Sequence, residues 1–228
     1  MIHMPKKLHC EVCARAKAHR TSKKKAALAA DATGPSIPVR FGAQATADHL
    51  IKNDGGEEDD GIPHDTVAVV LLDRGTGWID IYPKGANTAE HTVEALQHLA
   101  GARDKITSFY CDNATELKAA ARHCAWRIST ATPGQPQTNG AVERSVRTVN
   151  EGGSCGMVQS GLHPKWWPSA GKQFCFSRDT AMIDGDSCYH IRHGNGHFKG
   201  LLIPFGALVE LMPQGESKTG SFGGKTFK

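Results

Sequence analysis

Three acidic residues stand where this chain is best placed to bind a metal ion. Asp48 lies within a predicted strand, Asp112 at the end of another, and Glu143 in the first turn of a predicted helix. If the two strands are neighbours and the helix crosses their edge, the three carboxylates meet. Carboxylates held that close repel one another unless a cation lies between them, and oxygen-only ligands favour Mg²⁺ or Mn²⁺. Taken singly, each acid could equally be an ordinary turn or helix-cap residue.

Such a cluster predicts chemistry at phosphorus. Two ions about 3.5–4 Å apart can activate a water or a 3′-hydroxyl and stabilise the leaving oxygen. The sequence offers no nucleotide-binding glycine loop and no convincing Ser/His or Cys/His nucleophile that would indicate another reaction.

A second group of candidate ligands lies near the N-terminus. Cys10 and Cys13 have the spacing at which two thiolates bind one Zn²⁺, and His3 and His9 precede them. Two thiolates are half of a zinc site, so a complete site depends on these histidines. The other cysteines show no ligand spacing, and their odd total of seven argues against a disulfide framework.

Charge is unevenly distributed along the 228 residues, although the net value is only +4. Residues 1–40 hold nine basic and two acidic residues, residues 41–100 hold three and eleven, and residues 101–228 hold fifteen and ten. This pattern indicates a polyanionic partner beside a cation site. The longest apolar run, 67–72, is too short to span a membrane, and the first ten residues lack a signal-peptide core. We therefore expect an intracellular chain with no membrane partner.

The elements that must position the acids follow an α/β order. Strands are predicted at 44–50, 67–72, 78–82, 105–111 and 126–131, and helices at 87–100, at 116–125, from 141, and at 163–176. Three strands followed by alternating helices and strands predict a mixed five-stranded sheet flanked by helices.

Local signals refine the helix ends. Asn87 is expected to cap the first of these helices with Glu90 at the capping-box position, and Gly101 to end it. The pair Gly152-Gly153 is expected to break the helix from residue 141, because each glycine costs about 1 kcal/mol relative to alanine. Residues 201–213 predict a short strand pair at most.

The segments Asp112-Asn-Ala-Thr-Glu-Leu117 and Thr132-Pro-Gly-Gln-Pro-Gln-Thr-Asn-Gly-Ala-Val-Glu-Arg144 resemble motifs of the retroviral-type integrase core, nearest to the copia-type retrotransposon Pol polyprotein. The second segment is specific, whereas an Asp-Asn pair alone is weak. The resemblance implies a ribonuclease-H-like fold and makes Asp48, Asp112 and Glu143 the catalytic acids that hold Mg²⁺ or Mn²⁺. One departure is that only 30 residues separate Asp112 from Glu143, fewer than the family usually has.

The same resemblance implies a fragment with four parts: a partial zinc segment with Cys10, Cys13 and His3 (1–25), a linker (26–40), the catalytic core (41–182), and a truncated C-terminal extension with a disordered tail (183–228). It also implies DNA integration by 3′-end processing and strand transfer. The expected partners are DNA and further copies of the chain, with no small-molecule substrate. The expected location is the nucleus.

Candidate DNA contacts surround Glu143. Arg147 and Asn150 are four and seven residues further along, so they share its helix face, where a DNA phosphate must lie. Arg144 adjoins it, and Gln137 and Asn139 lie in the preceding loop. A solvated arginine and ordinary turn residues are the alternative interpretation.

Two other functions remain open. An inactive, integrase-derived remnant would bind DNA through phosphates in a salt-dependent way without chemistry. A metal-dependent nuclease on the same fold would cut DNA but not join it.

Overall fold

The computed structural model describes Lys7, residues 9–16, 38–52, 65–102, 104–130, 140–211 and 225–227. In chain order its elements are α1 Glu11–Ala16, β1 Ala45–Ile51, β2 Val67–Asp73, β3 Ile79–Lys84, α2 Ala89–Ala100, β4 Ser108–Cys111, α3 Thr115–His123, β5 Arg127–Thr130, α4 Gly140–Ser160, the 3₁₀ turn η2 Pro164–Trp166, α5 Trp167–Thr180, α6 Cys188–His193, β6 Val209–Leu211 and β7 Lys225–Phe227. No helix within these ranges is long and apolar enough to cross a membrane.

The centre of the molecule is a mixed five-stranded sheet with the strand order β3-β2-β1-β4-β5. Strands β1, β2 and β3 are antiparallel neighbours, whereas β4 pairs in parallel with both β1 and β5. Parallel neighbours need a crossover connection, and α2 and α3 provide the crossovers to β4 and β5. The predicted α/β architecture is therefore confirmed.

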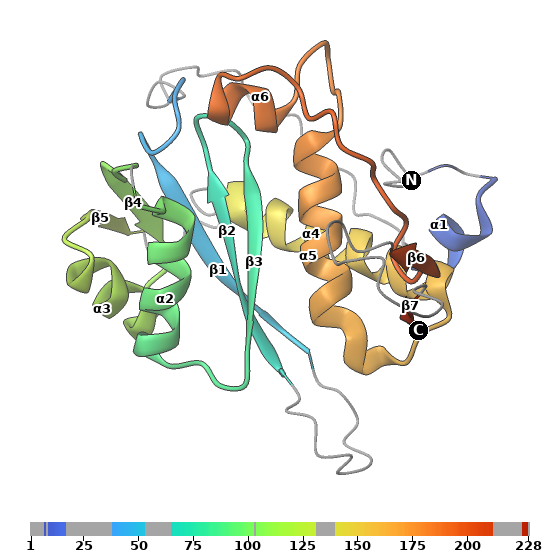
Figure 1. Cartoon of the computed structure of the whole chain (residues 1–228). Helices are drawn as coiled ribbons and strands as arrows, with labels where there is room; N and C mark the ends of the chain where they lie inside the picture. The colour runs from blue at the N-terminus through green and yellow to red at the C-terminus, as the bar shows by residue number, and fades with distance from the viewer. Residues whose placement is uncertain are drawn as a thin grey trace, which may run out of the picture.

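Helices cover both faces of the sheet, with α2 and α3 on one side and α4 and α5 on the other (Figure 1). Strand β2 shows why both faces are apolar. Val69 and Leu71 belong to the core under α2 and α3, whereas Ala68 and Val70 belong to the core under α4 and α5. Side chains of a strand alternate between faces, so a continuous apolar run buries both.

The expected helix break at Gly152-Gly153 is wrong, because α4 runs without interruption from Gly140 to Ser160. Both glycines are buried where α4 crosses α5. A Cβ on Gly152 would fall on the ring of Phe174, and one on Gly153 would lie 3.4 Å from the Cα of Gly171. Close packing between the two helices at Gly152 thus offsets the low helix propensity of glycine, whereas the contact at Gly153 is an ordinary one.

Two other local expectations also change. The cap of α2 is Thr88 rather than Asn87, and its hydroxyl accepts a hydrogen bond from the His91 N–H at 3.3 Å. Asn87 instead donates to Glu116 at 2.7 Å. The last predicted helix begins as the 3₁₀ turn η2, and α5 itself starts at Trp167. Within the C-terminal extension, β6 and β7 form a separate two-stranded sheet.

Candidate active site at the β1–β4 edge

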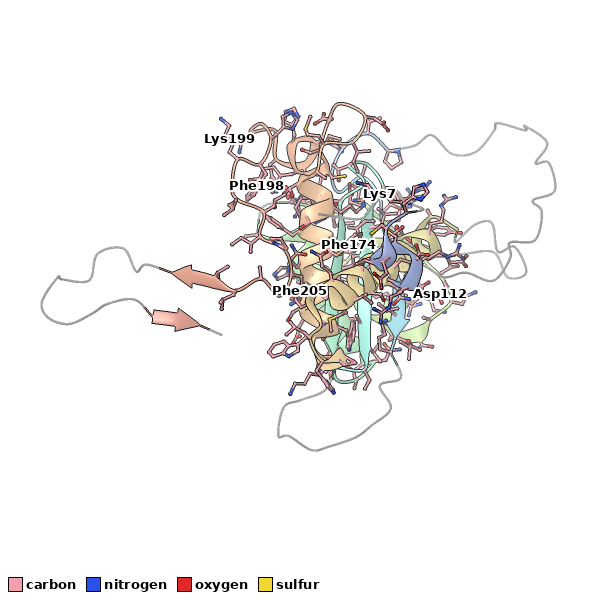
Figure 2. The ribbon with its side chains drawn as sticks, turned by 90° about the vertical axis from the view of Figure 1, so that its right-hand side faces the viewer. Lys7, Asp112, Phe174, Phe198, Lys199 and Phe205 are labelled. Carbon is pink, nitrogen blue, oxygen red and sulfur yellow. The ribbon has the colours of Figure 1, made fainter. Side chains whose placement is uncertain are left out.

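The parallel pairing of β1 with β4 brings Asp48 and Asp112 together. Ala47 pairs with Cys111, and each aspartate is the next residue along its own strand direction. Asp112, labelled in Figure 2, directly follows β4, and its carboxylate accepts a 2.9 Å hydrogen bond from the Ala114 N–H. Asp48 lies within β1 and accepts one of 2.8 Å from the His49 N–H. Both side chains are half-buried.

Glu143 reaches the same neighbourhood from α4. It is exposed in the first turn of that helix, which packs on β1 and β2. The pKa of Asp48 is raised, chiefly by burial and further by the negative charges of Asp112 and Glu143. The three acids therefore share one electrostatic field, and that field disfavours ionisation of Asp48.

This edge is open rather than closed around an ion. Among the described residues, one group of three potential ligands has its ligand atoms all within 4.8 Å of one another, and it consists of Asp186, His190 and His197. The three acids at the edge are spaced more loosely.

His49 and Glu116 also lie at this edge, although neither was expected to be a site residue. The Nδ1 atom of His49 lies 3.9 Å from the Glu116 carboxylate, and its Nε2 is buried without a hydrogen-bond partner. The pKa of Glu116 is lowered by its own backbone N–H at the start of α3 and then by the amide of Asn87. A histidine directly after the first acid and a glutamate four residues after the second were the available signals.

The candidate DNA contacts separate into two groups. Arg144 and Arg147 are exposed on α4, as expected for side chains that meet a phosphate. Asn150 is half-buried and lines a cavity of about 440 Å³ between α4 and α5, where its side-chain oxygen has no hydrogen-bond partner. Gln137 and Asn139 lie outside the described residues.

The N-terminal thiols lie at one end of α1, which packs against α4. Cys10 precedes the helix, and Cys13 is completely buried within it. The pKa of Cys10 is lowered, most strongly by a hydrogen bond from the Cys13 backbone N–H. A low thiol pKa favours the thiolate form that binds zinc. His3, the third proposed ligand, lies outside the described residues.

No family model and no curated protein matches the chain by sequence. Solved structures do match. The catalytic core of HTLV-2 integrase, solved with magnesium in a trimeric form, is 14% identical over 68% of this chain and 99% of its own, with a TM-score of 0.51. A simian T-cell lymphotropic virus intasome, in complex with the PP2A regulatory subunit B56 gamma, is 14% identical over 80% and 63%, with a TM-score of 0.50. The catalytic core of BIV integrase is 18% identical over 66% and 93%, with a TM-score of 0.48.

At these identities the structural matches establish the fold and nothing finer. The mixed five-stranded sheet with helices on both faces is the ribonuclease-H-like fold of integrase catalytic cores.

Proposed function

We propose that this chain is the catalytic core of a copia-type retrotransposon integrase, which processes DNA 3′ ends and joins them to target DNA. The observation that carries the proposal is the parallel register of β1 and β4, which sets Asp48 beside Asp112 within the field of Glu143. The fold and the specific segment Thr132–Arg144 support it. The paired strands β1 and β4 therefore place two carboxylates where they could bind one cation.

The residues at the edge suit Mg²⁺ or Mn²⁺. The three acids supply oxygen ligands only, which hard cations prefer. Burial, and then repulsion from Asp112 and Glu143, raises the pKa of Asp48, and a cation at the edge would neutralise the negative charge of the three acids. The HTLV-2 core was solved in complex with magnesium. Bound metal would polarise the phosphodiester and activate the attacking oxygen.

Each acid has its own part in the proposed reaction. Asp48 and Asp112 would hold the shared ligand positions, because both are fixed by backbone hydrogen bonds to their carboxylates. Glu143, which is exposed on α4, would complete the site when DNA is bound.

The DNA backbone would lie along the first turns of α4. Arg144 and Arg147 project from this region into solvent and can neutralise phosphates, and we include Gln137 and Asn139 of the preceding loop as contacts. Asn150 faces the cavity, so we leave it out of the DNA surface. We propose that the active form is a multimer that acts on chromosomal DNA in the nucleus, and that Cys10 and Cys13 with His3 bind zinc.

A joining assay tests the catalytic proposal. A labelled, preprocessed 3′ end is incubated with target DNA and Mg²⁺ or Mn²⁺, using wild type, Asp112→Asn and the control Glu90→Gln, which changes an exposed acid on α2. We expect joining by wild type and Glu90→Gln and none by Asp112→Asn. Loss in both variants, or joining by Asp112→Asn, would contradict the assigned role of Asp112.

The two alternative functions give other products. Metal-dependent cutting without joining would identify a nuclease. Salt-sensitive DNA binding without any product would identify an inactive remnant.

A further inference from the structure

A second group of potential metal ligands lies around α6. It is far along the chain from the acidic edge, which consists of Asp48, Asp112 and Glu143. The Nδ1 atom of His190 lies 2.8 Å from the Asp186 carboxylate, and the Nδ1 atom of His197 lies 3.8 Å from the same oxygen. The two imidazole rings meet with centroids 4.7 Å apart. The side chains are 39%, 42% and 43% exposed for His190, Asp186 and His197, so an ion from solvent can reach all three.

The local backbone explains why the three side chains converge. Asp186 and His190 are four residues apart around the start of α6, and Ser187 caps that helix by accepting the His190 N–H at 3.2 Å. After α6 the chain turns back through Gly194 and Gly196, whose φ angles are 67° and 84°. A residue with a side chain rarely adopts such backbone angles, so these glycines permit the reversal that returns His197 to Asp186.

A buried residue already orients His197. The Ser187 side chain is only 1% exposed, and its hydroxyl lies 3.1 Å from the His197 Nδ1 atom. The pKa of Asp186 is lowered, first by its hydrogen bond with His190, so the carboxylate is ionised at neutral pH. The group thus brings one carboxylate oxygen and two imidazoles close together, and a bound ion would replace the present hydrogen bonds of the two Nδ1 atoms.

We propose that Asp186, His190 and His197 bind one divalent transition-metal ion of the Zn²⁺ class, with water completing the coordination. Two imidazoles and one carboxylate suit Zn²⁺, whereas Mg²⁺ prefers oxygen ligands alone. The ligand atoms lie within 4.8 Å of one another, and side-chain rotation would bring them to Zn–N and Zn–O distances of about 2.0–2.2 Å around one ion. This site does not depend on the proposed integrase activity, and it lies outside the N-terminal zinc segment.

The bound ion would fasten the chain after α6 to the body of the domain. Phe198, labelled in Figure 2, follows His197 directly. Its ring packs against Phe176 of α5 and Tyr189 of α6, at centroid distances of 5.1 Å and 5.7 Å. The chain then descends beside α5 (Figure 1), where Gln173 donates a 3.0 Å hydrogen bond to the Ile203 carbonyl. An ion that fixes His197 would therefore also fix the start of the segment that leads to β6.

Calorimetric titration with ZnCl₂ tests the site in the full-length chain. Every protein carries Cys10→Ser and Cys13→Ser, and excess Mg²⁺ occupies the acidic edge, so that neither place binds the added zinc. The variants are His197→Ala and His190→Gln. Glutamine at 190 can keep a hydrogen bond to Asp186 but is a poor zinc ligand. The control, His123→Ala, removes an exposed histidine at the end of α3.

We expect one equivalent of Zn²⁺ to bind the parent and the His123→Ala protein with the same Kd. Binding by His197→Ala and by His190→Gln should weaken at least about tenfold, as ligand-sphere changes do elsewhere. In EDTA all four proteins should unfold in one cooperative transition, which separates ligand loss from misfolding. Equal affinity in all four proteins, or no one-equivalent binding by the parent, would overturn the proposal.

Discussion

The acidic edge and the α6 cluster both contain carboxylates, yet the two places are built in different ways. The acidic edge takes one acid each from β1, the end of β4 and α4, which lie far apart in the sequence. The α6 cluster takes its three ligands from residues 186–197. The edge depends on sheet register and helix docking, whereas the cluster depends on one helical turn and one glycine-rich reversal.

The two places also differ in chemistry. The edge offers oxygen ligands, and burial together with repulsion from Asp112 and Glu143 raises the pKa of Asp48, so the edge suits a hard cation that compensates charge. The α6 cluster pairs its carboxylate with imidazoles, and the pKa of Asp186 is lowered. The first arrangement accumulates unfavourable charge that only a ligand relieves, whereas the second is already partly compensated by its own hydrogen bonds.

The largest expected effect separates the two places by function. Glu143→Gln should lower the joining rate by about 10³-fold, because it removes one of three charged ligands at the site where charge develops. The same variant should keep the wild-type affinity for Zn²⁺ at the α6 cluster. Parallel joining assays and zinc titrations measure both. A joining rate within tenfold of wild type would remove Glu143 from the proposed catalytic set.

The next effect concerns the helix that carries Glu143. Gly152→Ala should lower the free energy of unfolding by about 3 kcal/mol, because the new Cβ would overlap the Phe174 ring and push α4 from α5. The matched control is Gly153→Ala, whose Cβ meets only ordinary contacts and which gains helix propensity, so its stability should be unchanged or slightly higher.

Denaturant unfolding of the two glycine variants gives the comparison directly. Equal stability of both would show that the α4–α5 approach at Gly152 is not as close as described. The α6 cluster should bind Zn²⁺ normally in the folded fraction of either protein, since its ligands are local.

A smaller effect concerns stabilisation by metal. Free Zn²⁺ at about tenfold above its Kd should stabilise the folded chain by about 1.4 kcal/mol, or about 3–5 °C in the unfolding temperature of a domain of this size. His197→Ala should abolish this rise. Thermal unfolding with Zn²⁺ and with EDTA, in the background without Cys10 and Cys13, checks it, and a rise that persists in His197→Ala would place the stabilising ion elsewhere.

The smallest expected effect is a gain in stability when a site residue is replaced. Asp48→Asn should slightly raise the unfolding temperature of the metal-free protein at pH 7. The folded-state pKa of Asp48 is raised, so wild type loses stability as pH rises from the ordinary aspartate range through that raised pKa, and asparagine does not. Asparagine can still accept the His49 N–H.

Two conditions should remove this difference in unfolding temperature between Asp48→Asn and wild type. Lowering the pH below the ordinary aspartate range protonates the acid in both the folded and unfolded chain, and saturating Mg²⁺ compensates its charge in wild type. A metal-free Asp48→Asn protein less stable than wild type at pH 7 would show that the three acids do not strain one another.

Much of the fold could be predicted from local pattern. The apolar run 67–72 and the order of strands and helices indicated a mixed α/β sheet, and all five strands form near their expected positions. The predicted helix break at Gly152-Gly153 was wrong because helix propensity takes no account of the Phe174 ring, which fills the space beside Gly152. The α2 cap moved by one residue because Asn87 bonds to Glu116, a partner 29 residues away.

By itself, the sequence determined which groups are available: three oxygen-bearing acids in a specific motif context, a basic helix face, and the alternating apolar strands that make a two-faced sheet. These follow from composition and short-range periodicity. Only the tertiary structure decided which groups meet. The β1–β4 register placed Asp48 beside Asp112, the packing around α4 left Asn150 lining a cavity, and Asp186, His190 and His197 converged. Strand pairing and helix docking arise from contacts between distant stretches of the chain, which no local pattern contains. The α6 cluster lies within residues 186–197, but it forms only because the backbone reverses after α6 and returns His197 to Asp186.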